Sequence, residues 1–185
     1  MEKNLQQSTS PEDNSATLFG RISEWFDKND WNYNTYGEEE EKSLSARVSC
    51  SNGKWRLVVR ASEELRESYF WSTLDINVPE DRRMAVAEFI TRANYGKRIG
   101  FFEMDWRDGE IRFNVSFSIA DGALTDVQIA KAADGVLNGM DRHFVALMSV
   151  IYGGQDPLAA LTEMNTKKAP ENDMTKLEAP STAVH

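Results

Sequence analysis

The fold is constrained most strongly by an alternation of apolar and polar residues that recurs in five segments. Between residues 44 and 50, for instance, leucine, alanine, valine and cysteine alternate with serine and arginine. A period of two places successive side chains on opposite faces of a strand, so this pattern predicts strands with one apolar and one polar face. A sheet of such strands is covered on one side and open on the other. The five predicted strands are 44–50, 55–61, 69–76, 102–106 and 111–119.

Two pairs of these strands are predicted to form hairpins. The turn Ser51–Lys54 contains an Asn-Gly pair between the first two strands, and Arg107–Gly109 joins the last two. Asn-Gly and Asp-Gly pairs adopt the backbone conformations that tight hairpin turns require. Antiparallel neighbours are therefore expected at both places.

Three longer segments have the apolar spacing of amphipathic helices. The first, 17–29, has one apolar face, and Ser15 is its expected N-cap. The second, 79–95, has a proline in its first turn, where the missing N–H costs nothing. The third spans 125–153 and begins at a Thr-Asp-Val-Gln capping box.

In the order α-β-β-β-α-β-β-α, these elements predict an α+β fold with a five-stranded, mainly antiparallel sheet and helices on one face. We expect a single domain over residues 15–153. The run Glu38–Glu41 is expected to be a solvated loop. Residues 1–14 and 154–185 are mostly polar and are expected to be flexible tails, with one short helix at 156–164.

Charge and cysteine content exclude several function classes. The chain has 21 Lys and Arg against 30 Asp and Glu, a net charge of −9, which disfavours nucleic acid as a partner. Its one cysteine, Cys50, cannot form an internal disulfide. The N-terminus lacks the apolar core of a signal peptide, and no segment reaches the length of a membrane span. A cytoplasmic protein without a membrane partner is therefore expected.

The polar face of the predicted sheet carries the candidate partner-binding residues. Arginine and aromatic side chains are enriched where proteins bind one another, so a protein partner is one interpretation of this face. The other is that charged and aromatic pairs across the strands simply stabilise the sheet. The candidates are Arg47, Arg56, Arg60, Tyr69, Trp71 and Arg112.

Gly135 and Gly139 stand out because glycine is unfavourable inside a helix, by about 1 kcal/mol relative to alanine. One hypothesis is a break in the helix near Asp134, and a second is close packing of the helix on the protein's own sheet. A third is that a second helix or a second subunit approaches there, which would make the protein a homodimer.

The sequence offers little catalytic chemistry. Its two histidines are His143, inside the third predicted helix, and His185, the last residue of the chain. Cys50 occupies an inward strand position, so no nucleophile with a partnering base is evident. Four carboxylates cluster around the last hairpin without the spacing of a known metal loop: Glu103, Asp105, Asp108 and Glu110. We therefore expect neither an enzyme nor a metal or cofactor.

The block Asn77–Arg112 carries a family resemblance. It contains Asn-Val-Pro-Glu-Asp-Arg-Arg at the start of the second helix and Arg-Ala-Asn-Tyr-Gly at its end. Gly-Phe-Phe-Glu-Met-Asp and Asp-Gly-Glu-Ile-Arg follow in the last two strands. These motifs resemble the YbjN domain, and the resemblance extends over about residues 15–153.

This resemblance implies a fold similar to that of type III secretion chaperones and a role among bacterial regulators of sensory transduction. It carries over no catalytic residue. Since such chaperones commonly pair, it also suits a homodimer. The function expected is a non-enzymatic, protein-binding module that acts as a regulatory or chaperone-like adaptor. The alternative is a regulatory domain that senses a small molecule held between the sheet and the helices.

Overall fold

A computed structural model describes residues 17–38, 41–119 and 122–166 of the chain. The tails expected at 1–14 and beyond residue 166 lie outside the described residues. The described part contains one antiparallel sheet of six strands in the order β1-β2-β3-β4-β6-β5. The strands are β1 (Asn34–Tyr36), β2 (Ser43–Ser49), β3 (Lys54–Ser62), β4 (Glu67–Asn77), β5 (Phe101–Met104) and β6 (Glu110–Ser118).

The prediction of five strands was wrong by one. Residues Asn34–Tyr36 form the edge strand β1, which pairs with Ser43–Ser45 of β2. All three residues are exposed, so this strand has no buried face and leaves no alternation of apolar and polar residues. Its pairing rests on main-chain hydrogen bonds, which a pattern of side chains does not reveal.

Within the described residues, four α-helices and one short 3-10 helix accompany the sheet. Helix α1 begins one residue after Thr17, whose side chain accepts a hydrogen bond from the backbone N–H of Gly20 over 2.9 Å. Thr17 is thus the N-cap in place of Ser15, which lies outside the described residues. The helices are α1 (Leu18–Lys28), the 3-10 turn Glu80–Arg82, α2 (Arg83–Asn94), α3 (Asp126–Ile151) and α4 (Pro157–Thr166).

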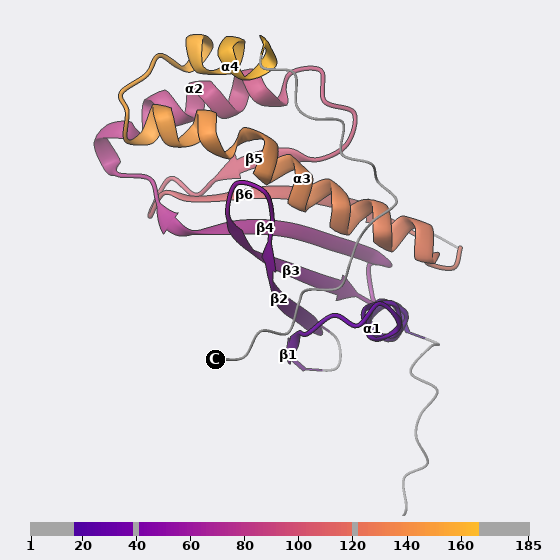
Figure 1. Cartoon of the computed structure of the whole chain (residues 1–185). Helices are drawn as coiled ribbons and strands as arrows, with labels where there is room; N and C mark the ends of the chain where they lie inside the picture. Colours follow the sequence, from indigo (N-terminus) through magenta and orange to yellow (C-terminus); the bar gives the residue numbers. More distant parts are fainter. Residues whose placement is uncertain (1–16, 39–40, 120–121, 167–185) are drawn as a thin grey trace, which may run out of the picture.

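Helix α3 is continuous over 26 residues, so the hypothesis of a break near Asp134 was wrong. The predicted capping box at its start is confirmed, with the Thr125 and Gln128 side chains each bonded to the other's backbone N–H. Figure 1 shows α3 lying across the sheet, with α2 and α4 beyond it near β5. The expectation of helices on one face of the sheet is confirmed for the described residues.

The core lies between that face and the helices. Its largest fully buried side chains include Phe26 of α1, Phe70 of β4, Phe89 of α2 and Leu147 of α3. Every second side chain along a strand thus points into this core, on the predicted inward face, as the alternation requires. The opposite face of the sheet is not covered by any described helix.

Helix α4 makes the folded unit longer than the predicted domain. It lies where a short helix was expected, but it packs against α2 and α3 and buries Ala160 and Leu161. Residues 157–166 therefore extend the packed structure beyond the expected domain boundary at residue 153. The apolar residues of α4 predict a helix, but the surface of α2 and α3 that receives them is built by other parts of the chain.

The motifs of the block Asn77–Arg112 hold the structure together. The Val78 N–H donates to the carbonyl of Gly109 over 2.9 Å, and a Cβ at Gly109 would lie 2.3 Å from the Val78 oxygen. Gly109 also has φ +82°, a conformation that favours glycine. The second residue of the Asp-Gly motif therefore has to be glycine, because the Asn-Val-Pro motif lies directly against it.

Two further motif residues make long-range backbone contacts. The Asn94 side chain donates to the Phe102 carbonyl over 2.8 Å and accepts from the Phe102 N–H over 2.7 Å. It therefore pairs with the edge strand β5 as a neighbouring strand would. Arg83 donates to the Trp106 carbonyl over 3.0 Å, which ties the start of α2 to the last hairpin. These motif residues therefore stabilise the fold.

Candidate functional site

The six predicted partner-binding residues share the open face of the sheet. The strand register aligns Arg47, Arg56 and Thr73 with Arg112 in one row, and Arg60 lies directly opposite Tyr69 in another. Between these rows runs a third, in which Val58, Trp71, Asn114 and Phe101 are successive partners. Six residues from the four strands β2, β3, β4 and β6 are therefore brought together, as the alternation predicted. We call these three rows the open sheet face.

Trp71 lies at the centre of the open sheet face and is half-buried. The guanidinium carbon of Arg60 is 5.9 Å from the Trp71 ring centroid, and that of Arg112 is 5.4 Å from it. Both distances fall in the range of cation–π attraction. The register places Arg60 and Arg112 diagonally on either side of Trp71, so the indole is held between two cations.

Arg47 and Arg56 lie opposite one another on neighbouring strands, an arrangement that is unfavourable for two like charges. Both donate to Asp75, Arg47 to one carboxylate oxygen and Arg56 to the other, each over 2.8 Å. Hydrogen bonds from Arg47 and then Arg56 lower the pKa of Asp75 below its usual value. One carboxylate thus forms ion pairs with two arginines.

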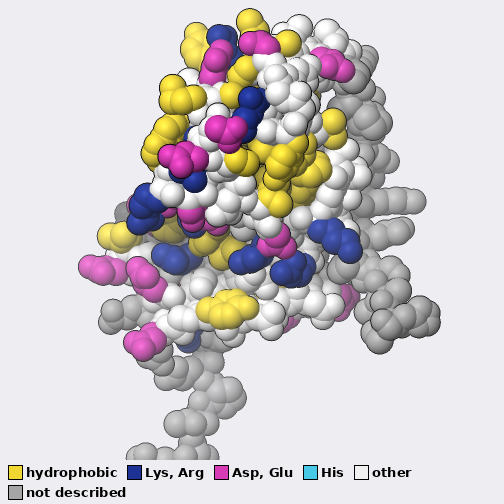
Figure 2. All heavy atoms as spheres, turned by 90° about the vertical axis from the view of Figure 1, so that its left-hand side faces the viewer, with side chains coloured by type: hydrophobic (Ala, Val, Ile, Leu, Met, Phe, Trp, Pro, Cys, Tyr) yellow, Lys and Arg dark blue, Asp and Glu magenta, His cyan; other side chains and the backbone are white. Residues whose placement is uncertain are grey.

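Two hollows indent the open sheet face around these arginines. One of about 810 Å³ lies over β1 to β3 and is lined by Tyr36, Arg47 and Val58 among others. The other, of about 530 Å³, lies beside Asp75. Figure 2 shows the left-hand end of the molecule in Figure 1, where hydrophobic side chains gather among charged side chains of both signs. The larger hollow of the open sheet face is lined by Arg47 and Arg56 together with Tyr33, Tyr36 and Val58, so it offers both charge and apolar surface.

Gly135 and Gly139 both lie against β6 of the same chain. A Cβ at Gly139 would lie 2.3 Å from the Phe113 ring, and one at Gly135 would lie 3.4 Å from a Val115 methyl group. This confirms the hypothesis that the helix packs closely on its own sheet. The glycines therefore require no second subunit, and the homodimer stays a prediction.

The two residues considered for catalysis differ in exposure, since Cys50 is half-buried and His143 is buried. Burial and then the charge of Asp141 raise the pKa of Cys50 to about 11, so its thiol stays protonated near neutral pH. His143 is 4% exposed, and burial with the nearby Lys97 lowers its pKa to about 4. Neither residue has a geometry that couples a nucleophile to a base.

Three of the four carboxylates considered at the last hairpin, Asp105, Asp108 and Glu110, are engaged with neighbouring groups. Asp105 pairs with Arg107 over 2.7 Å, and those hydrogen bonds lower its pKa to about 2. Asp108 accepts the backbone N–H of Glu110 over 2.9 Å, and the Glu110 side chain pairs with Arg112 over 2.6 Å. Within the described ranges, no three His, Cys, Asp or Glu side chains converge as metal ligands would.

One feature was missed in the sequence: a pocket of about 480 Å³ between α2, α3 and α4. Three cationic residues line it, namely Arg92, Lys97 and Arg142. A sequence signal existed, because Arg92 and Lys97 flank the end of one predicted helix while Arg142 and His143 share another. The pocket could not be assembled without knowing that α4 closes it.

The chain was compared with known proteins. The model of the YbjN family, described as "Putative bacterial sensory transduction regulator", matches residues 19–148. The structure is similar to the crystal structure of YbjN, "a putative transcription regulator from E. coli", with a TM-score of 0.47, 12% identity, and coverage of 74% of this chain and 90% of that chain. A search of curated proteins found no match. Among the described residues, no helix is long and apolar enough to span a membrane.

Proposed function

This chain belongs to the YbjN family, and from that premise we propose that it is a non-enzymatic regulatory adaptor that binds a polypeptide partner on its open sheet face. The observation that carries the proposal is Trp71, half-buried at the centre of an uncovered sheet between Arg60 and Arg112. Trp, Tyr and Arg are the residue types that most often dominate binding energy at protein interfaces.

The charges of the open sheet face favour one kind of partner. Arg47 and Arg56 share a single carboxylate, and Arg60 lies 3.9 Å from the Glu41 carboxylate, its nearest ion-pair partner among the described residues. These arginines therefore retain capacity to bind further carboxylates. We infer that the partner presents a segment in which acidic side chains flank an apolar or aromatic one. The apolar group would lie on Trp71 and Val58, and the acids on the surrounding arginines.

The geometry also suits a chaperone-like mode of action. The open sheet face is wide and shallow, with hollows rather than a deep enclosed cavity. A surface of this kind fits an extended or helical segment better than a small substrate, which is usually bound in a concave site. The lack of a coupled nucleophile and base at Cys50 and His143 supports a binding role rather than a catalytic one.

The experiment that tests this proposal is affinity purification from the native host with mass spectrometry. The wild type is compared with a double variant, Trp71→Ala with Arg56→Glu, that removes the central indole and reverses one neighbouring charge. The matched control is Trp106→Ala with Arg98→Glu, the same substitutions at exposed positions outside the open sheet face. Circular dichroism verifies that both variants are folded.

We expect the wild type and the control to recover one stoichiometric polypeptide and the Trp71 variant to lose it. An isolated segment of that polypeptide, rich in Asp and Glu, should then bind about thirtyfold more weakly to Trp71→Ala, a typical effect at the centre of an interface. Recovery by both double variants alike would contradict the assignment of the face. Failure of the wild type to recover any polypeptide would contradict the adaptor itself.

A further inference from the structure

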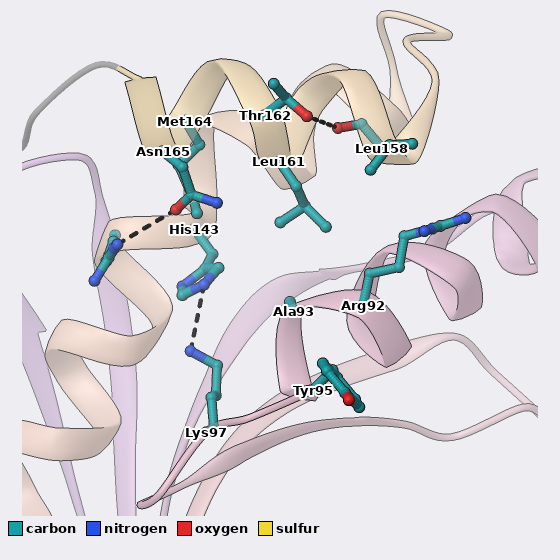
Figure 3. Close-up of a pocket in the computed structure, with 11 residues that line it drawn as sticks. Arg92, Ala93, Tyr95, Lys97, His143, Leu158, Leu161, Thr162, Met164 and Asn165 are labelled. Carbon is teal, nitrogen blue, oxygen red and sulfur yellow. Dashed lines mark hydrogen bonds between the residues drawn. The ribbon is translucent and has the colours of Figure 1, made fainter.

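The pocket between α2, α3 and α4 lies on the covered side of the sheet, away from the open sheet face. Its walls come from the end of α2 with the residues that follow, the middle of α3 and the inner side of α4. Figure 3 shows His143 and Lys97 pointing toward one another at one end of the pocket. Leu161 of α4 points toward Ala93 of α2 across the open space.

The charges on the lining are of one sign. Three cations line the pocket, and no carboxylate side chain does. Arg92 is paired with Glu88 over 2.8 Å and points away from the centre of the pocket. Lys97 and Arg142 have no salt bridge to any described residue. The Arg142 side chain donates a hydrogen bond to Oδ1 of Asn165 over 3.4 Å. A cationic pocket is notable in a chain of net charge −9.

His143 positions Lys97 at this end. The Nδ1 of His143 lies 2.7 Å from the Gly139 carbonyl, an acceptor, so Nδ1 carries the proton and donates. The neutral ring then presents a lone pair on Nε2, which accepts a hydrogen bond from the Lys97 ammonium over 3.4 Å. Because a neutral acceptor does not cancel the lysine's charge, the ammonium keeps its capacity to bind an anion.

The two cations lie in different surroundings, since Lys97 is half-buried and Arg142 is exposed. Burial, followed by the charge of Arg142, lowers the pKa of Lys97 below its usual value. A bound anion would offset both effects, since it pairs with the two cations at once. Apolar side chains of α4 also line the pocket: Leu161 is 7% exposed, and Leu158 is 51% exposed.

We propose that this pocket is a binding site for a small organic anion, with its acidic head on Lys97 and Arg142 and its apolar body between α2 and α4. The head is a carboxylate or a phosphate ester, the two acidic groups that Lys and Arg bind most often. This site goes beyond the proposed function, because it faces away from the open sheet face. It can be occupied whether or not a polypeptide partner is bound.

The test is a titration of the full-length, ¹⁵N-labelled protein followed by two-dimensional NMR. The probes are heptanoate and hexyl phosphate, which share a six-carbon chain and differ in the acidic head, and hexanol, which has the same chain without the charge. We expect saturable shifts with at least one anion, with a dissociation constant on the order of 1 mM. The shifts should be confined to 92–97, 139–143 and 157–165. The tighter anion identifies the preferred head.

Matched variants identify the residues that bind the head. Lys97→Met removes the charge and keeps most of the side-chain volume, and it should weaken anion binding about tenfold or more. Lys131→Met, at an exposed position of α3 outside the pocket, is the control and should leave binding unchanged. Because Lys97 also lies 5.4 Å from the Phe113 ring centroid, Arg142→Gln provides a second variant should Lys97→Met fail to fold.

Three results would overturn the site. Equal shifts with hexanol and with both anions would show that the charge is not recognised. Unchanged affinity for the anions in folded Lys97→Met and Arg142→Gln would show that these cations do not bind the head. Absence of saturable shifts at 92–97, 139–143 and 157–165 with either anion would show that the pocket does not bind organic anions.

Discussion

Gly139 of α3 lies so close to Phe113 of β6 that a Cβ atom on the glycine would be 2.3 Å from the ring. That separation is far below any van der Waals contact between carbon atoms. The absence of a side chain at Gly139 therefore lets α3 approach the middle of the sheet. The same approach brings His143, one helical turn later, over Phe102, with the ring centroids 5.2 Å apart.

We predict that Gly139→Ala destabilises the protein, although alanine is the better helix former by about 1 kcal/mol. The added methyl group must displace the Phe113 ring or the helix, and overpacking of this kind typically costs about 1–3 kcal/mol. Gly135→Ala is the matched control, since its Cβ would meet Val115 at 3.4 Å, an ordinary contact. It should be neutral or stabilising by up to about 1 kcal/mol.

Urea unfolding, followed by circular dichroism, gives the free energy of unfolding of both alanine variants. Adding Phe113→Leu makes the facing side chain smaller and should recover part of the stability that Gly139→Ala loses. In the wild type, the same substitution leaves a cavity and should lower stability. If the two glycine variants changed stability equally, close packing of Gly139 on Phe113 would not be the reason for its glycine.

The second prediction concerns the pH dependence of stability through His143. Burial lowers the pKa of this histidine from 6.5 to about 4 in the folded state. Above pH 6.5 the ring is neutral in both states and contributes no pH dependence. As the pH falls from 6.5 toward 4, only the unfolded chain takes up the proton, so the free energy of unfolding falls by about 3 kcal/mol in all.

The measurement is the difference between wild type and His143→Gln in urea unfolding at a series of pH values from 7.5 to about 4. Carboxylates titrate in both proteins and cancel in the difference. The variant should lose stability less steeply than wild type between pH 6.5 and about 4. Parallel curves over that window would mean that His143 takes up its proton equally in the folded and unfolded states.

The third prediction concerns the reactivity of Cys50. A shift of its pKa from 9.0 to about 11 lowers the thiolate fraction at pH 8 about a hundredfold, although each thiolate becomes a better nucleophile. The net expectation is a reaction with Ellman's reagent about tenfold slower, or more, than in the urea-unfolded chain. Equal rates in the two states would contradict the burial of this thiol.

Much of the fold could be predicted because its information is local. The alternation in β2, β3, β4 and β6 identifies both the strands and their inward faces, and the capping box at Thr125 marks the start of α3. By contrast, β1 has no buried face, and α4 depends on a groove between α2 and α3. The residues of β1 therefore carry little signal, whereas a helix was expected at 156–164 and only the packing of α4 could not be predicted.

The candidate site, like the fold, could be predicted only in part. The residues of the open sheet face could be predicted together, because a period of two is enough to place Arg56, Trp71 and Arg112 on one side. Their pairing could not, since the Asp75 carboxylate between Arg47 and Arg56 depends on the register of three strands. The pocket at Lys97 was missed because its lining comes from three helices far apart in the sequence.

The measurement that tests the adaptor most directly is site-specific photo-crosslinking in the native host. Phe101 is 43% exposed and lies in the same row of the open sheet face as Trp71. With p-benzoylphenylalanine at position 101, we predict crosslinking to one polypeptide, at a segment rich in Asp and Glu. The same group at Trp106, outside that face, should not form this crosslink. Crosslinking from both positions alike, or from neither, would contradict a partner bound on the open sheet face.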